Sequence, residues 1–358
     1  MIPVNKPFLP PLDEYQQMLT AIWEKNILTN NGPNVKSLEA SLADYFDLRR
    51  VHLVSSGTMA IQIALKALQV RGEVLTTPFS YVATTSSIVW ENCVPKFVDI
   101  EPLTLNIDPS KIEEAITEDT SAILATHCFG NSCDIYSINA IAKRNNLKVI
   151  YDAAHSFGSH YDGSSVFKFG DVSITSFHST KLFHTVEGGA LFTSDPKVGE
   201  RIDFLRNFGH DGPECFDGVG INGKMSEIHA AMGLVNLRYV NDILQSRREQ
   251  FDFYKELLSS LEISLVESSE ISIGNHSYFP ILFKSEDELL KALKFLANNG
   301  ISTRRYFYPP LNHLNYVKST SLPVVEDISR RILCLPMYFQ LTREEQKRVV
   351  IALEEALK

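Results

Sequence analysis

Short apolar segments alternate with helix-like segments through the first two-thirds of the chain, and this alternation restricts the fold more than any other feature. Strand-like segments occur at residues 51–54, 73–77, 96–100, 121–126 and 149–152. Helical periodicity separates them at residues 58–70, 81–90, 110–116 and 135–146. Such βαβ units bring successive strands into one sheet in the same direction. We therefore predict an α/β fold with a mostly parallel central sheet and helices on both of its faces.

The pattern changes in the last third of the chain. A long helical pattern at residues 227–250 precedes a strand at 278–284, a helix at 287–299, a strand at 301–306 and a helix at 343–357. With 358 residues, the chain exceeds the usual size of one domain. We predict a large domain at residues 1–239 and a smaller α+β domain at residues 240–358, bridged by the long helix.

Composition argues against several classes of partner. The net charge is −9 and no cluster of basic residues is present, so we do not expect nucleic-acid binding. The five cysteines are scattered without a Cys-x-x-Cys motif, which argues against disulfides and zinc and favours the reducing cytoplasm. No apolar run approaches the roughly 20 residues that span a bilayer. We expect no metal and no membrane association.

Lys181 and Asp152 are the most informative polar residues. Lys181 lies between Thr180 and a Glu-Gly-Gly turn, and Ser176 precedes it as a possible phosphate donor. Asp152 ends a predicted parallel strand, where open α/β sheets bind their ligands. Pyridoxal phosphate needs an amine for an imine and a carboxylate for its ring nitrogen. A solvated lysine and a turn-capping aspartate are the ordinary alternatives, which the residues alone leave open.

Further candidates surround a cofactor of this kind. Ser56, Gly57 and Thr58 begin a predicted helix directly after a strand, and the unpaired N–H groups of a first helical turn bind phosphate. The alternative is a simple helix cap by Ser56. Tyr81 could stack on a flat heterocycle or lie in the core. His155 could lie beside the cofactor or be a structural histidine.

Residues 218–223 match the pattern G-x-G-x-x-G, which is found in dinucleotide-binding proteins. That pattern must follow a strand, whereas here a polar loop rich in Gly and Pro precedes it. We therefore do not predict dinucleotide binding.

A set of short motifs occurs in a characteristic order along the whole chain. They are residues 28–33, 54–58, 95–100, 152–155, 176–181, 187–189 and 222–227. Through these motifs the chain resembles the DegT/DnrJ/EryC1/StrS sugar aminotransferases, which are fold-type I pyridoxal phosphate enzymes. The resemblance covers essentially all of the chain and implies that fold.

The resemblance also implies a role for each matching position. Lys181 corresponds to the lysine that binds the cofactor, and Asp152 to the partner of its pyridinium nitrogen. The other matches are phosphate contacts at Gly57, Thr58 and Ser176, a stacking ring at Tyr81, a place beside the cofactor oxygen at His155, and a contact with the neighbouring subunit's phosphate at Asn222. Asn222 therefore implies a homodimer with shared active sites.

The resemblance points to a substrate class. The family transfers amino groups, usually from L-glutamate, to nucleotide-linked keto sugars, with pyridoxamine phosphate as the intermediate cofactor form. A dehydratase branch carries His at the position of Lys181, so transamination is favoured. Residues 178–187 and 303–310 are most similar to members that convert dTDP-4-keto-6-deoxy-D-glucose to dTDP-4-amino-4,6-dideoxy-D-glucose. A 3-keto sugar, a GDP- or UDP-linked sugar, a dehydratase and a non-catalytic dimer remain alternatives.

Candidate substrate contacts are fewer. Arg304 ends a predicted strand, and a guanidinium group matches a pyrophosphate with a planar fork of donors. An ordinary surface arginine is the equal alternative. Tyr308 and His313 could face the sugar, and His184 could line the site because it closely follows Lys181.

Overall fold

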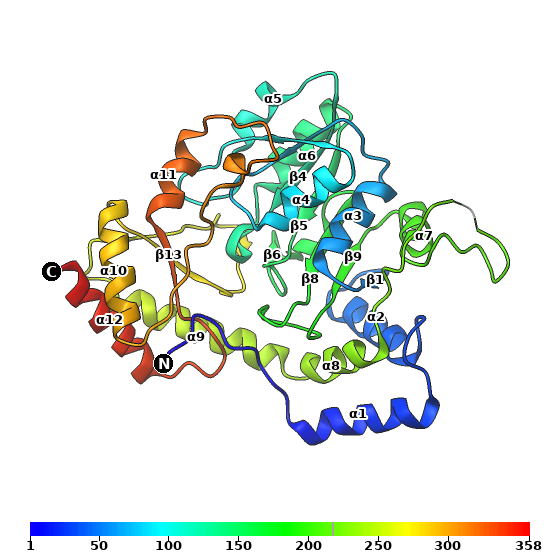
Figure 1. Ribbon diagram of the computed structural model, residues 1–358, viewed down its shortest axis with the longest axis horizontal. Coiled ribbons are helices and arrows are strands. Elements are labelled where there is room, and N and C mark those ends of the chain that lie inside the picture. The colour runs from blue at the N-terminus through cyan, green and yellow to red at the C-terminus, as the bar shows by residue number, and fades with distance from the viewer. Residues whose placement is uncertain (217) are drawn as a thin grey trace.

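A seven-stranded sheet forms the centre of the molecule in the computed structural model, which describes residues 1–216 and 218–358 (Figure 1). Its strands are β1 (Val51–Val54), β2 (Glu73–Thr76), β3 (Val94–Phe97), β4 (Thr120–Thr126), β5 (Lys148–Asp152), β8 (Val172–Ser176) and β9 (Gly189–Phe192). Their order is β1-β9-β8-β5-β4-β2-β3. Only the pairings made by β9 are antiparallel. The predicted mostly parallel sheet is confirmed.

Helices cover both faces of this sheet, as predicted. Successive side chains of a strand point to opposite faces, so Leu75 and Ile123 join one core whereas Val74 and Leu124 join another. The first core is covered by α2 (Pro33–Tyr45), α6 (Ile135–Arg144) and α8 (Glu227–Leu237). The second is covered by α3 (Gly57–Ala67), α4 (Val82–Trp90) and α7 (Pro196–Leu205).

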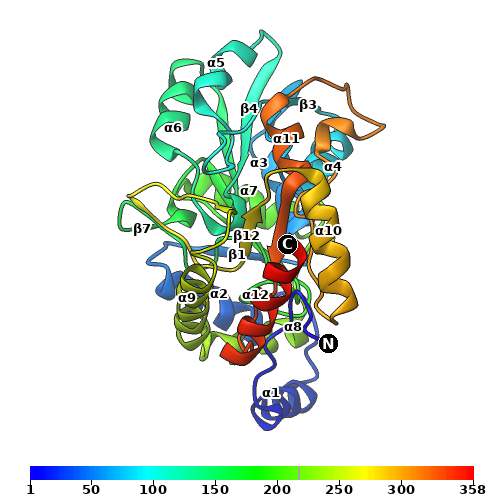
Figure 2. The ribbon, with the colours of Figure 1, turned by 90° about the vertical axis from the view of Figure 1, so that its left-hand side faces the viewer.

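The C-terminal part has a separate core beside a three-stranded antiparallel sheet (Figure 2). Its strands and helices are β10 (Ser264–Leu265), β12 (Phe279–Leu282), β13 (Ile332–Leu335), α10 (Glu286–Asn298) and α12 (Arg343–Leu357). The long helix α9 (Val240–Leu257) contributes Ile243 to the first core and Tyr254 to this one. It therefore bridges the two, as expected. The proposed division at residue 240 stays a prediction, and Ile2 also packs in the C-terminal core.

The remaining elements are short or peripheral. They are α1 (Leu12–Lys25), α5 (Ile112–Ala115), α11 (Pro323–Arg331), β6 (His160–Tyr161), β7 (Ser164–Ser165), β11 (Ser272–Ile273) and the 3₁₀ turns Pro109–Lys111, Cys128–Gly130, Val166–Lys168 and Leu311–His313. Within the described residues, no helix combines the length and the apolar character that crossing a membrane would require.

Two sequence expectations differ from the structure. The predicted helix at 227–250 is interrupted before α9, where the Tyr239 side chain packs against Phe8 and hydrogen-bonds to Glu14. Periodicity cannot reveal such contacts between distant segments. The predicted strand at 301–306 is wrong, because its backbone makes only isolated bridges at Ile301 and Arg304.

We predict that Ile150→Ala lowers the free energy of unfolding by about 2–5 kcal/mol, because truncating a buried residue leaves a cavity. Ile150 is fully buried in β5, the strand that ends at Asp152. The measurement is the denaturation midpoint, followed by circular dichroism. Ile351→Ala is the control, because Ile351 is 54% exposed on α12. Equal losses from the two substitutions would contradict the central position of β5.

Candidate active site

A cavity of about 370 Å³ opens at the carboxyl ends of the parallel strands. It brings together most of the residues that the sequence singled out: Ser56, Gly57, Thr58, Tyr81, Asp152, His155, Ser176, Lys181 and Arg304. These residues come from β5, β8, the starts of α3 and α4, and connecting loops. Their convergence follows from parallel strands, whose carboxyl ends lie at one edge of the sheet.

Asp152 is buried at the end of β5, and both of its oxygens accept hydrogen bonds. Oδ1 accepts from the Ala154 backbone N–H at 3.1 Å, and Oδ2 accepts from the Thr84 hydroxyl at 2.9 Å. Burial raises the pKa of Asp152, while these donors and the positive charge of Lys181 oppose the rise. The carboxylate is thus oriented and largely shielded from solvent.

Lys181 lies in the loop between β8 and β9 and lines the cavity. Its neighbours Leu182 and Phe183 are buried, and Phe177 donates its backbone N–H to the carbonyl of Gly188, which closes the loop. Burial lowers the pKa of Lys181 to about 8, although the charge of Asp152 acts in the opposite direction. The amine is therefore much closer to its neutral, nucleophilic form than an exposed lysine.

The first turn of α3 meets the end of β8. A side chain at Gly57 would place its Cβ 2.7 Å from the Cβ of Ser176, so only glycine allows this approach. Ser56 caps the helix by accepting the Met59 N–H at 3.1 Å. The capping alternative for Ser56 is therefore observed, and the following N–H groups and the Thr58 side chain border the cavity. The start of α3 and the hydroxyls of Thr58 and Ser176 form a cradle suited to a phosphate.

His155 is buried and lines the cavity. Its ring is nearly parallel to that of Phe307, with centroids 5.7 Å apart, and tilted against Tyr278 at 4.9 Å. Burial, with the nearby charge of Lys181, holds the pKa of His155 well below its usual value, so the ring is neutral. Its Nδ1 atom is buried without a hydrogen-bond partner among the described residues. The site thus offers one neutral imidazole beside the cavity.

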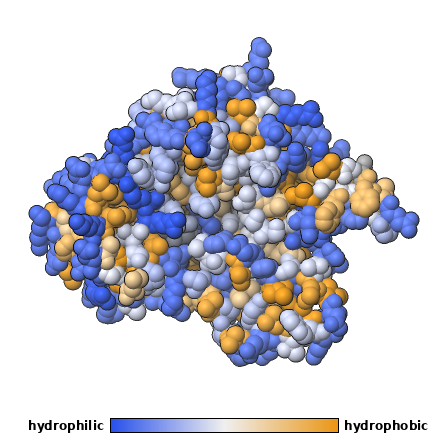
Figure 3. Space-filling model, in the orientation of Figure 1, coloured by the Kyte–Doolittle hydropathy of each residue, from blue (hydrophilic) through white to orange (hydrophobic). Residues whose placement is uncertain are grey.

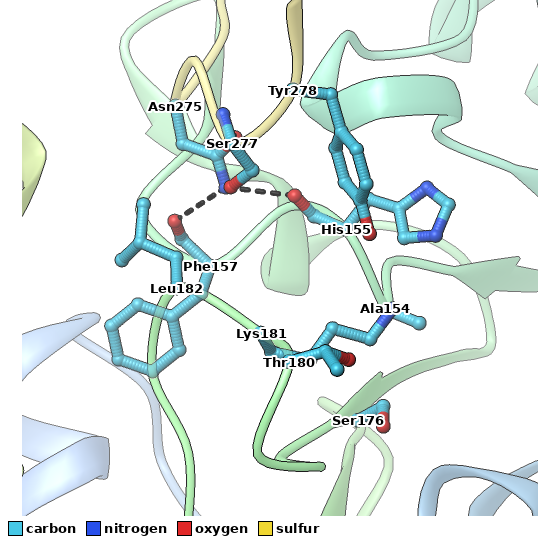
Figure 4. Close-up of a pocket in the computed structure, with 10 residues that line it drawn as sticks. All are labelled: Ala154, His155, Phe157, Ser176, Thr180, Lys181, Leu182, Asn275, Ser277 and Tyr278. Atoms are coloured by element: carbon cyan, nitrogen blue, oxygen red, sulfur yellow. Dashed lines mark hydrogen bonds between the residues drawn. The ribbon is translucent and has the colours of Figure 1, made fainter. Parts of the chain in front are cut away.

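Asn275 fixes the turn that carries His155. Its side-chain amide donates to the carbonyls of His155 at 2.7 Å and Phe157 at 2.9 Å (Figure 4). The same view shows the Lys181 side chain extending toward Ala154, which follows Asp152. Asn275 comes from the C-terminal part of the chain, and nothing in its local sequence indicates this role.

Further residues that were not predicted from the sequence also line the cavity. Among them are Ser80, Thr84, Thr126, His178, Glu187, Tyr278, Tyr306 and Phe307. Thr126 could have been found, because it ends β4, the strand next to β5. Tyr278, Tyr306 and Phe307 could not, because they come from the C-terminal part and reach the cavity only through tertiary packing.

The remaining predicted residues do not line this cavity: His184, Asn222, Tyr308 and His313. His184 is buried, and its Nε2 atom contacts the Phe8 carbonyl at 2.6 Å. Asn222 is exposed. Their proposed roles stay predictions.

Tyr308 and His313 already have partners elsewhere. Tyr308 lies under the guanidinium of Arg305, 3.6 Å from the ring centroid, and His313 is 3.2 Å from a carboxylate oxygen of Glu326. Arg304 differs from its neighbour Arg305, because it lines the cavity and lies 5.2 Å from the ring centroid of Tyr306.

Pyridoxal phosphate fits this set of groups. The phosphate cradle at Gly57 and Ser176, the buried carboxylate of Asp152 and the amine of Lys181 share one cavity. These are the three groups that the cofactor needs for its phosphate, ring nitrogen and aldehyde.

Comparison with known proteins agrees with this chemistry. A model of the DegT/DnrJ/EryC1/StrS aminotransferase family matches residues 12–354. A dTDP-4-amino-4,6-dideoxy-D-glucose transaminase of Shigella dysenteriae is 44% identical, covering 98% of both chains, and one of Escherichia coli is 39% identical, covering 96% of this chain and 95% of that one. The crystal structure of DesI in the presence of its TDP-sugar product has a TM-score of 0.94 at 29% identity, covering 100% of this chain and 93% of that one. The chain therefore belongs to the DegT/DnrJ/EryC1/StrS aminotransferase family.

Proposed function

We propose that the protein is a pyridoxal phosphate-dependent aminotransferase that moves an amino group from L-glutamate to dTDP-4-keto-6-deoxy-D-glucose. The product is dTDP-4-amino-4,6-dideoxy-D-glucose. The observation that carries the chemistry is that Lys181 shares one cavity with the buried carboxylate of Asp152 and the phosphate cradle at Gly57 and Ser176. The two relatives named for this product support the choice of sugar.

In this proposal each group of the cofactor has a partner in the chain. Asp152 holds the proton of the ring nitrogen, and the start of α3 with Gly57, Thr58 and Ser176 binds the phosphate. Tyr81, which caps α4 at the mouth of the cavity, stacks on the ring. The bound cofactor supplies an electron sink for the electrons of a broken C–H bond.

Lys181 moves the protons. Its Nζ atom would take the proton from the α-carbon of the amino donor and pass it to the cofactor, and in the second half-reaction it would take a proton from the cofactor and give it to C4 of the sugar. Proton transfer by a positioned group contributes typically ~10²–10⁴-fold. The amine suits both directions because burial lowers its pKa to about 8, near neutral pH.

Arg304 is the proposed contact for the pyrophosphate of the nucleotide sugar. It is an exposed residue at the cavity, where a doubly charged ligand needs a cation. A guanidinium group binds two phosphate oxygens with parallel hydrogen bonds.

A homodimer completes the proposal. Asn222 lies in the segment between α7 and α8, which we call the arm. The arm also exposes the apolar side chains Phe208, Val219 and Ile221, and α1 exposes Trp23. Apolar side chains gather on the same parts of the surface in Figure 3. Extended apolar patches of this kind mark protein interfaces. In the proposed dimer, the arm brings Asn222 to the phosphate in the partner's cavity.

The reaction is tested by a single turnover. Protein loaded with pyridoxamine phosphate is mixed with dTDP-4-keto-6-deoxyglucose, and the return of the visible absorbance of pyridoxal phosphate is followed. We expect rapid return in the wild type and none in Lys181→Ala. Lys66→Ala is the control, because Lys66 is an exposed residue of α3. Return only with a 3-keto, GDP-linked or UDP-linked sugar would reject the proposed substrate, and release of water from the sugar would indicate a dehydratase.

The pKa of Lys181 predicts a pH dependence. Only the neutral amine attacks the aldehyde of pyridoxal phosphate, so uptake by cofactor-free protein accelerates as the pH rises and levels off above about 8. Asp152→Asn removes the negative charge that stabilises the protonated amine. In this variant, the midpoint of the curve of uptake rate against pH therefore shifts to lower pH. Stopped-flow absorbance measures both rates. A wild-type midpoint near the value of about 10.4 for exposed lysines would contradict the burial of Lys181.

Mixing two variants tests the shared active site. Lys181→Ala subunits lack the amine, and Asn222→Ala subunits are expected to bind the cofactor poorly. In a mixed dimer, one site combines an intact Lys181 with an intact Asn222 of the other subunit. Activity should therefore rise when the two variants are unfolded and refolded together. No rise, with mixed dimers demonstrated by mass spectrometry, would place Asn222 in its own subunit's site or outside any site.

A further inference from the structure

A chain of buried hydroxyl groups leads to the Asp152 carboxylate. Thr84 Oγ1 donates to Asp152 Oδ2 at 2.9 Å and lies 2.8 Å from Ser80 Oγ. Thr126 Oγ1 donates to Ser80 Oγ at 3.1 Å. All three hydroxyl residues are buried and line the cavity. They come from separate parts of the fold: the end of β4, the loop before α4, and α4 itself.

The ionised carboxylate fixes the direction of every bond in this chain. A carboxylate only accepts, so Thr84 gives it its single hydroxyl proton. Ser80 must then donate to Thr84, and Thr126 must donate to Ser80. The three hydroxyl dipoles therefore align toward Asp152, and aligned bonds strengthen one another in a medium of low dielectric constant.

Hydrogen bonds donated to a carboxylate favour its ionised form. The bond from Thr84 therefore lowers the pKa of Asp152, in opposition to burial, which raises it. Among the described residues, Ser80 is the only hydrogen-bond partner of the Thr126 hydroxyl, so Thr126 is the first member of the chain. The arrangement therefore favours the ionised carboxylate, although burial favours the neutral acid.

We propose that Thr84 is a positioning residue of the reaction, and that the chain Thr126–Ser80–Thr84 keeps Asp152 ionised and turned toward the ring nitrogen. This inference rests on the proposed function, because the nitrogen belongs to bound pyridoxal phosphate. Without the Thr84 hydroxyl, the carboxylate becomes more basic and competes with the ring for the proton. A ring that loses its proton accepts electrons less well, so the reaction slows while sugar binding is unchanged.

Packing alone does not require the hydrogen bond of Thr84. Thr85, the next residue of α4, is equally buried, yet its hydroxyl has no partner within the described part of the chain. Thr85 is therefore a matched control. Thr85→Val replaces a buried hydroxyl by a methyl group in the same helix. It leaves the hydrogen-bonded hydroxyls that lead to Asp152 unchanged.

The test compares Thr84→Val, Thr84→Ser, Ser80→Ala and Thr85→Val with the wild type. Each protein is loaded with pyridoxal phosphate labelled with ¹⁵N at the ring nitrogen, and the nitrogen resonance is recorded by NMR. Single-turnover and steady-state rates are measured in parallel. The nitrogen resonance reports the proton directly and does not depend on the sugar substrate.

We expect the wild type and Thr84→Ser to show a protonated ring nitrogen. Thr84→Val should move the resonance toward neutral pyridine and lower kcat about 10-fold, as for loss of a hydrogen bond to a charged group, with KM for the nucleotide sugar unchanged. Ser80→Ala should act in the same direction but less strongly. Thr85→Val should change neither the resonance nor kcat.

Several outcomes separate this inference from the proposed function. An unchanged resonance in both Thr84→Val and Ser80→Ala would overturn the role of the hydroxyl chain but leave the aminotransferase intact. A protonated ring in a wild type that does not aminate the sugar would overturn only the substrate. A wild type that binds no cofactor would overturn both. If Thr84→Val fails to fold, the shift in Ser80→Ala and its absence in Thr85→Val decide the question.

Discussion

The site depends on holding two groups of opposite charge, Lys181 and Asp152, in one cavity. Burial lowers the pKa of Lys181 to about 8 and raises that of Asp152, while each charge opposes the shift of the other. Isolated charges are expensive to bury, so each needs compensation from its surroundings. This balance leaves an amine that can exchange protons near neutral pH beside a carboxylate whose pKa is raised by burial and lowered by its donors and by Lys181. The chemistry of the proposed reaction requires both groups at once.

The sheet provides the fixed frame for this pair. Asp152 ends β5, and the loop of Lys181 begins after the neighbouring strand β8. Strand spacing therefore fixes where Asp152 and the start of the Lys181 loop lie, and cores pack against both faces of these strands. Sites built on such elements hold their geometry more accurately than sites built on loops alone.

The C-terminal part closes the cavity from the other side. It supplies Tyr278 and Phe307 around the ring of His155, and Asn275 holds the backbone of His155 and Phe157. These contacts bury His155 beside the two charged groups, and electrostatic interactions are stronger away from bulk water. Helix α9 contributes to the first core and to the C-terminal core, and so connects the two parts of the chain.

The sequence by itself determined the layered fold, because alternation of strand and helix periodicity is a local property. It also placed Asp152 at a strand end and Lys181 in a motif-bearing loop, since strand ends and turn residues are visible in the chain. It could not reveal the partners of these groups. Thr84, Ser80 and Thr126 look like ordinary polar residues until folding aligns their hydroxyls, and the segment at 301–306 looked like a strand although it forms only isolated bridges. Only the tertiary structure decided these features, because each depends on distances between atoms that lie far apart along the chain.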